Sequence, residues 1–175
     1  MATTKRRLLA LARLAGVTTA WLCLPQPAFA QAGPSDAIAV IVHRSNPVDA
    51  LTRAELRHIF MFDTQTWPHG RKITVVLREK GQPERGEAIR LLCGLSEAEF
   101  DRHILFQTFG GSVNWGPRSI SSAAAMLRFV FNAPGAIGYV YADEFDGTTK
   151  VLRIDGLLPS DPKYALRIPA ARRGR

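Results

Sequence analysis

An arginine at the end of an apolar stretch offers the clearest chemistry in this sequence. Arg78 follows the run Ile73 to Leu77, and a helix-forming segment that ends at Gly94 comes after it. Where a strand leads into a helix, unpaired backbone N–H groups and the positive end of the helix dipole attract anions. A guanidinium group can also bind two anion oxygens at once. Residues 73–92 therefore form a candidate site for a small oxyanion, with Arg78 as a ligand. The alternative, which we rank higher, is a surface arginine at the strand end that forms a salt bridge with Glu79 or Glu84.

A second segment carries similar groups. Arg118, Ser119 and Ser121 supply a guanidinium and hydroxyls directly before another expected helix. The simpler interpretation is that Ser121 or Ser122 caps this helix. If Arg78 and Arg118 lie close together in the fold, the two segments form one anion site, and the sequence leaves that question open.

Other kinds of chemistry find little support. His43, His58, His69 and His103 are widely spaced, and none forms the short pair common in metal sites. The sequence has no Gly-x-Ser-x-Gly motif, and Cys93 has no His or Lys beside it to lower its pKa. We expect Cys93 to be a buried apolar side chain. We therefore expect no enzyme, metal or cofactor, and a hydrolase or metal enzyme is only a third hypothesis.

The first 30 residues have the order of a secretory signal peptide. A basic cluster at Lys5 to Arg7 precedes the mostly apolar segment from Leu8 to Leu24, and the stretch ends in small residues at Ala28 and Ala30. The alternative is a membrane anchor, but Arg13 interrupts a run shorter than the ~20 residues that a spanning helix needs. We expect cleavage after Ala30, a periplasmic or secreted protein, and no stable membrane insertion.

The charge of the chain says little about its partners. Of the formal net charge of +8, half lies in the predicted signal peptide, and Arg172, Arg173 and Arg175 lie in a basic C-terminal segment. The remaining body is close to neutral, so we expect no nucleic-acid partner. The expected organisation is a signal peptide (1–30), a leader (31–36), one α/β domain (37–160) and a basic tail (161–175).

Strands and helices alternate along this domain. The β-branched run 38–42 is typical of a strand covered on both faces, and Thr52 and Ser96 each begin a capping-box helix. We expect strands at 38–42, 72–77, 136–141 and 151–154, a turn at 67–70, a loop at 78–86, and helices ending near 60, 94, 110 and 132. This order indicates an α/β layer fold. We expect most aromatic side chains, including Phe106, Phe109 and Phe131, in the core, whereas Phe62 and Trp115 could instead border a groove.

Several of these segments resemble a known family. The sequence from Ile38 to Val42, the motif Ser45-Asn46-Pro47, the turn Trp67-Pro68-His69-Gly70 and above all Pro134-Gly135-Ala136-Ile137-Gly138-Tyr139-Val140 are similar to the periplasmic phosphate-binding proteins of ABC transporters. The resemblance covers residues 37–142. It implies a periplasmic-binding-protein-like (type II) lobe, with a mixed β-sheet flanked by helices. These proteins close two lobes on an oxyanion, and this chain has the length of about one.

The resemblance also points to particular ligands. Arg78 and Gly81 match the anion-binding loop of the family, and Gln82 follows them in the same loop. The Ser and Thr ligands of the family are missing, Lys80 stands near the place of its acid, Pro83 removes an amide donor, and Glu84 would repel an anion. We therefore expect weak binding, with Arg118, Ser119 and Ser121 as further candidate ligands.

Two hypotheses follow. The first is an exported solute-binding-like protein that binds phosphate or a similar oxyanion weakly and works with an ABC permease. The second is an envelope interaction module that kept the fold, lost the anion site and uses an exposed apolar surface, for example to form a homodimer. The first requires the Arg78 guanidinium to face an open hollow. A hollow filled by Glu84 would leave only a secreted scaffold.

Overall fold

The structure, a computed structural model, describes residues 36–110 and 116–169. Its main sheet has the strand order β4-β3-β5-β1-β6. These strands are β1 (Ile38–Val42), β3 (Thr74–Arg78), β4 (Arg118–Ile120), β5 (Ala136–Tyr141) and β6 (Lys150–Val151). Strand β3 runs parallel to β4 and β5, whereas β1 is antiparallel to β5 and β6. Two short strands, β2 (Ala50–Leu51) and β7 (Arg153–Ile154), pair in a separate parallel sheet.

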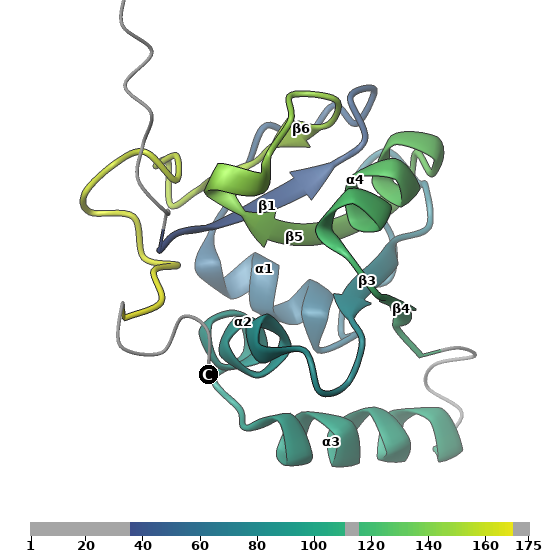
Figure 1. The fold of residues 1–175 in the computed structure, drawn as a ribbon. Helices are drawn as coiled ribbons and strands as arrows, with labels where there is room; N and C mark the ends of the chain where they lie inside the picture. The colour runs from purple at the N-terminus through teal and green to yellow at the C-terminus, as the bar shows by residue number, and fades with distance from the viewer. Residues whose placement is uncertain (1–35, 111–115, 170–175) are drawn as a thin grey trace, which may run out of the picture. The chain divides into compact units, whose positions relative to one another are not determined.

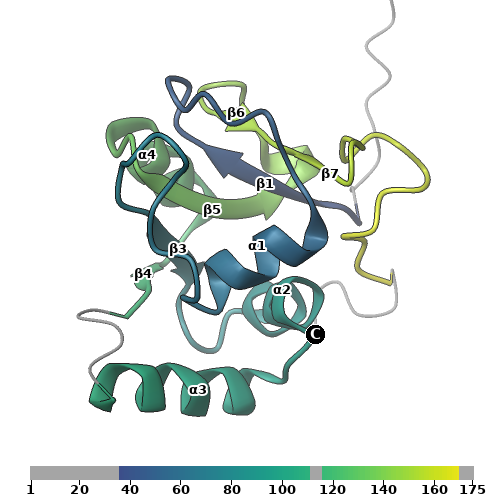
Figure 2. The ribbon, with the colours of Figure 1, turned by 180° about the vertical axis from the view of Figure 1, so that it is seen from behind.

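Helices cover both faces of the main sheet. Helix α4 (Ala123–Asn132) lies on one face, and α1 (Arg53–Phe60) and α2 (Pro83–Cys93) lie on the other (Figures 1 and 2). In β1, Val40 faces the core under α1 and α2, and Ile41 faces the core under α4. This explains why residues 38–42 form an uninterrupted apolar run. The expected α/β fold with a mixed sheet flanked by helices is confirmed.

The helix boundaries follow local signals in the sequence. Thr52 caps α1 and Ser96 caps α3 (Glu97–Phe109), each in a complete capping box. Hydrogen bonds from Thr52 lower the pKa of Glu55, and those from Ser96 lower the pKa of Glu99. Helix α3 packs on α2 rather than on the sheet (Figure 1). A short 3₁₀ helix, η1 (Ala142–Glu144), follows β5.

Two predicted boundaries near the candidate site were wrong. The loop predicted over 78–86 is shorter, because Pro83 begins α2 and its fixed φ suits the first helical position. Glu84 therefore lies in the first turn of α2. The predicted tail also starts too early, because Tyr164, Leu166 and Ile168 are buried in the core. The domain thus continues beyond residue 160.

The expected core is also incomplete at its edges. Phe106, Phe109 and Phe131 are 70%, 83% and 51% exposed, so the prediction that they are buried was wrong, whereas Phe62 is buried. The burial expected for Cys93 is confirmed. Trp115, the signal peptide, residues 31–35 of the leader and the three arginines of the tail lie outside the described residues. None of the described helices is long and apolar enough to span a membrane.

Candidate anion site

Arg78 is the last residue of β3 and is buried, with 6% of its surface exposed. Its backbone N–H donates a hydrogen bond to the hydroxyl of Tyr139 at 3.3 Å, and its carbonyl oxygen accepts one from Arg85 Nη1 at 2.7 Å. Burial raises the pKa of Tyr139, so this hydroxyl stays neutral. Residues from the neighbouring strand and from α2 thus hold the end of β3 in place.

The guanidinium of Arg78 is bound to a carboxylate of the same chain. Its Nη2 and Nε donate to one oxygen of Glu84, at 2.9 Å and 3.2 Å. Both side chains are largely shielded from solvent, with 8% and 15% exposure. The third nitrogen, Nη1 of Arg78, is buried and has no hydrogen-bond partner among the residues that the structure describes. One edge of the guanidinium is therefore used, and one donor is unsatisfied.

A narrow hollow lies beside this ion pair. Arg78, Glu84, Ala123 and Tyr139 are among the residues that line it, and it leaves no room for a water-sized molecule. Ala123 is the first residue of α4, so the N-terminal ends of α2 and α4 both adjoin the ion pair. Their positive dipole ends favour a negative charge here. Glu84 supplies that charge.

The Glu84 carboxylate thus stands where an oxyanion would be held. The alternative of an ion pair between Arg78 and Glu84 is confirmed, although Arg78 is buried rather than on the surface. The open hollow that the anion-site hypothesis required is not present, because the first turn of α2 carries the carboxylate onto the guanidinium. An anion that uses the Nε–Nη2 edge of Arg78 has to displace Glu84 first. A group held within the same chain loses no translational entropy when it binds, so Glu84 competes strongly with a free anion.

Two backbone amides of the loop after Arg78 are already hydrogen-bonded. Gly81 adopts φ = +83°, a conformation that favours glycine, and Gln82 caps α2 without a side-chain hydrogen bond. The amide of Glu79 donates to the Ile120 carbonyl and that of Gln82 to the Glu79 carbonyl. These two N–H groups are not offered to a ligand.

The second predicted segment stays apart from the hollow. Arg118 and Ser119 are exposed on the edge strand β4, where Arg118 pairs with Val76, two residues before Arg78. Ser122 rather than Ser121 caps α4, and its hydroxyl accepts from the Ala125 amide at 3.1 Å. Arg118, Ser119 and Ser121 are not among the residues that line the hollow. The structure therefore does not support one shared site.

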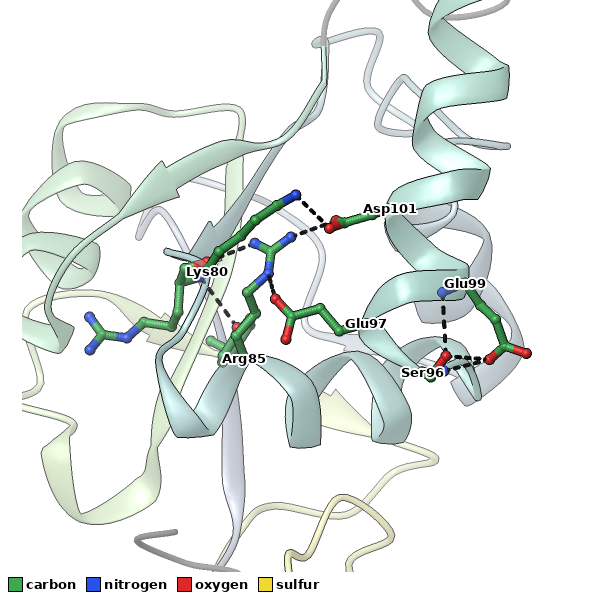
Figure 3. Close-up of polar contacts among 8 residues, drawn as sticks. Lys80, Arg85, Ser96, Glu97, Glu99 and Asp101 are labelled. Atoms are coloured by element: carbon green, nitrogen blue, oxygen red, sulfur yellow. Dashed lines mark hydrogen bonds and ion pairs between the residues drawn. The ribbon is translucent and has the colours of Figure 1, made fainter.

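A network around Arg85 supports the loop from behind. Arg85 is 2% exposed and donates to Glu97 on α3 at 2.6 Å and to Asp101 at 3.0 Å (Figure 3). Lys80 also pairs with Asp101, at 2.6 Å. Together with the bond to the Arg78 carbonyl, these contacts join β3, α2 and α3. The network fixes where Arg78 and Glu84 lie.

Sequence reasoning missed this network and named no role in it for Glu97, which lies in the first turn of α3. Its spacing of four residues from Asp101 places both carboxylates on one face of α3, which was the available signal. The partner on α2 could not be predicted, since the helix was expected to begin after Arg85.

Comparison with solved structures identifies proteins of similar fold. The chain is similar to an ABC-type phosphate transport receptor from Vibrio cholerae (TM-score 0.57, 22% identity, 72% of this chain and 50% of that one). It is also similar to a putative phosphate ABC transporter substrate-binding protein from Clostridium perfringens, solved with bound phosphate. The TM-score is 0.57 and the identity 22%, over 70% of this chain and 48% of that one. A third similar structure is PstS from Borrelia burgdorferi, with a TM-score of 0.59 and 16% identity over 75% of this chain and 54% of that one.

These likenesses show the fold. The described domain is a periplasmic-binding-protein-like α/β fold, and the resemblance to phosphate-binding proteins is confirmed at that level. The chain spans about half the length of these solved proteins. No protein-family model matches the sequence, and a search of curated proteins found no match.

Proposed function

We propose that this chain is an exported, non-enzymatic solute-binding-like protein in which Glu84 occupies the anion position beside Arg78. A phosphate-like oxyanion binds only by displacing that carboxylate, so its affinity in the wild-type protein is low. The buried Arg78 guanidinium carries this proposal, because it lies between two helix N-termini and has an unpaired Nη1. The fold shared with phosphate receptors supports the same assignment.

The location and the partner that we propose follow from the same structural likeness. The similar proteins are ABC transport receptors or substrate-binding proteins. We therefore propose a periplasmic location after cleavage of residues 1–30, and an ABC permease as the partner that would receive a bound anion. Both parts of the proposal rest on the fold and on the N-terminal sequence.

Calorimetry with phosphate, sulfate and arsenate tests the site. We expect the wild-type protein to bind in the millimolar range at best. Glu84→Ala should bind at least about tenfold more tightly, because it frees the guanidinium and opens the hollow. Glu79→Ala is the matched control, since Glu79 is the exposed neighbouring carboxylate in the same loop, and it should leave the affinity unchanged.

A folded Glu84→Ala protein that gives no heat at millimolar anion would overturn the proposal. Circular dichroism establishes that the variant is folded. The double variant Glu84→Ala/Arg78→Gln separates the proposed site from other cationic surfaces. If it keeps the affinity of Glu84→Ala, the anion binds elsewhere.

One observation favours the second candidate, an envelope interaction module. On α3, Leu105, Phe106 and Phe109 are 54%, 70% and 83% exposed and form an apolar face. Light scattering after size exclusion tests whether this face joins two copies. We expect Phe106→Ser/Phe109→Ser to shift a dimer to a monomer, and a wild-type monomer that is also indifferent to anions would exclude this candidate.

A further inference from the structure

A second cavity lies at the other end of α2 from the Arg78–Glu84 pair. It is a groove between α1 and the last turns of α2, which lie side by side (Figure 2), and its volume is about 610 Å³. Glu84 lies in the first turn of α2, whereas Arg90 and Cys93 line this groove near the helix C-terminus. The groove is therefore separate from the candidate anion site.

The rim of the groove is cationic. Arg53 and Arg57 stand one turn apart on α1, and Arg90 lies across from them on α2. Arg90 is paired with Glu87, at 3.1 Å from its Nε. Within residues 36–110 and 116–169, neither Arg53 nor Arg57 forms a side-chain ion pair or hydrogen bond. As far as the described residues go, these two exposed guanidinium groups are thus available to an anion.

The rim holds one carboxylate of its own. Asp63 also lines the groove, but its carboxylate is paired with the His58 ring, with Oδ2 3.0 Å from Nδ1. Both of these side chains are exposed. Glu87 offsets Arg90, and the Asp155 carboxylate accepts a hydrogen bond from the Arg53 backbone N–H at 3.0 Å. The positive charge of the rim therefore comes from the side chains of Arg53 and Arg57.

The floor of the groove is apolar. Leu56, Leu92 and Leu166 are buried there, with the half-buried side chains of Met61 and Leu91 beside them. Cys93 also lies on the floor, where burial raises the pKa of its thiol to about 12 and the charge of Arg57 acts in the opposite direction. The thiol is therefore neutral and behaves as an apolar group.

We propose that this groove binds a small amphiphilic anion, in which a phosphate or carboxylate group is attached to an apolar body. The anionic group pairs with Arg53 and Arg57, and the apolar body lies on the leucine floor. A volume of about 610 Å³ falls within the range of about 300–1,000 Å³ that is usual for small-molecule sites. Inorganic phosphate has no part that could use this floor.

Calorimetry with three probes tests the proposal. Hexyl phosphate carries both chemical features, inorganic phosphate lacks the apolar body, and 1-hexanol lacks the charge. We expect hexyl phosphate to bind the wild-type protein at least about tenfold more tightly than either of the others. Equal affinity for hexyl phosphate and inorganic phosphate would overturn the proposal, whatever happens at Arg78.

Variants then place the binding in the groove. Arg53→Gln/Arg57→Gln should weaken hexyl phosphate binding about tenfold or more, because it removes both free guanidinium groups and leaves the floor intact. The control is Arg102→Gln on α3, which removes an exposed arginine close to Phe106 and should change nothing. Unchanged affinity in the double variant, or an equal loss in the control, would refute the assignment. Both substitutions are at exposed positions, so the variants should fold normally.

Discussion

The Nη2 atom of Arg78 lies 2.9 Å from a carboxylate oxygen of Glu84, six residues further along the chain. The two residues belong to different elements, the end of β3 and the first turn of α2. Their contact converts a predicted anion site into an internal ion pair. This relationship determines what the rest of the site can do, because the same guanidinium cannot hold Glu84 and a ligand along one edge.

Removal of Glu84 should destabilise the protein and make it respond to anions. Glu84→Ala leaves a buried guanidinium without its counter-charge, and we expect a loss of about 2–4 kcal/mol in the free energy of unfolding. Phosphate should recover part of this loss, since a ligand that binds only the folded state stabilises it. Urea unfolding with phosphate or with chloride of equal ionic strength measures both effects. Rescue by chloride to the same extent would contradict this prediction.

Arg85 should matter more for stability than its exposed neighbour Lys80. Arg85→Ala removes a fully paired, buried guanidinium and leaves Glu97 without its partner, so we expect a loss of about 3–5 kcal/mol. Lys80→Ala breaks a pair in which the lysine is 72% exposed, which should cost less than about 1 kcal/mol. Chemical unfolding compares the two variants, and similar losses would contradict the network described here.

The two sides of α3 should respond differently to substitution. Phe100 is fully buried, so Phe100→Ala should cost about 3–5 kcal/mol. Phe106 is 70% exposed, and Phe106→Ser should change the free energy of unfolding by less than about 0.5 kcal/mol in the monomer. Measurement by urea unfolding at low protein concentration avoids association. A large loss for Phe106→Ser would show that this side chain is buried in solution.

The thiol of Cys93 should weaken the fold at high pH. Burial raises its pKa to about 12, whereas in the unfolded chain the same thiol ionises with its ordinary pKa of 9.0. The contribution of this buried neutral thiol to the free energy of unfolding is fully present below pH 9 and is lost as the pH rises towards 12. Cys93→Ala lacks this titration. The difference in unfolding free energy between wild type and variant should therefore shrink from pH 8 to pH 11, and a constant difference would contradict the prediction.

A packing prediction concerns the turn before β5. The carbonyl oxygen of Gly135 accepts hydrogen bonds from the Trp67 indole at 3.1 Å and from the Thr74 amide at 3.0 Å. A methyl group on Gly135 would clash with the backbone carbonyl of Lys72. We expect Gly135→Ala to cost about 1–3 kcal/mol, because backbone atoms cannot move aside cheaply. A thermal melt compares it with Gly116→Ala, whose added methyl group would lie at an ordinary contact distance of 3.7 Å from Ile104.

Much of the fold was predictable because its signals are local. A capping box requires only Thr52 and Glu55, or Ser96 and Glu99, which lie within one helical turn of each other. Likewise, an apolar strand such as 38–42 shows its burial on both faces in its own composition. The same holds for Gly94 at the end of α2, whose φ of +72° suits glycine.

The candidate site depended on the sequence and on the tertiary structure in different ways. The sequence by itself determined that a buried-strand arginine leads into a helix, and that an acid follows it. Only the tertiary structure decided that Glu84 binds Arg78, that Arg85 reaches Glu97 on another helix, and that Arg118 stays apart. The physical reason is that these distances depend on where α2 begins and how α3 packs on it, and such long-range packing leaves no local pattern in the sequence.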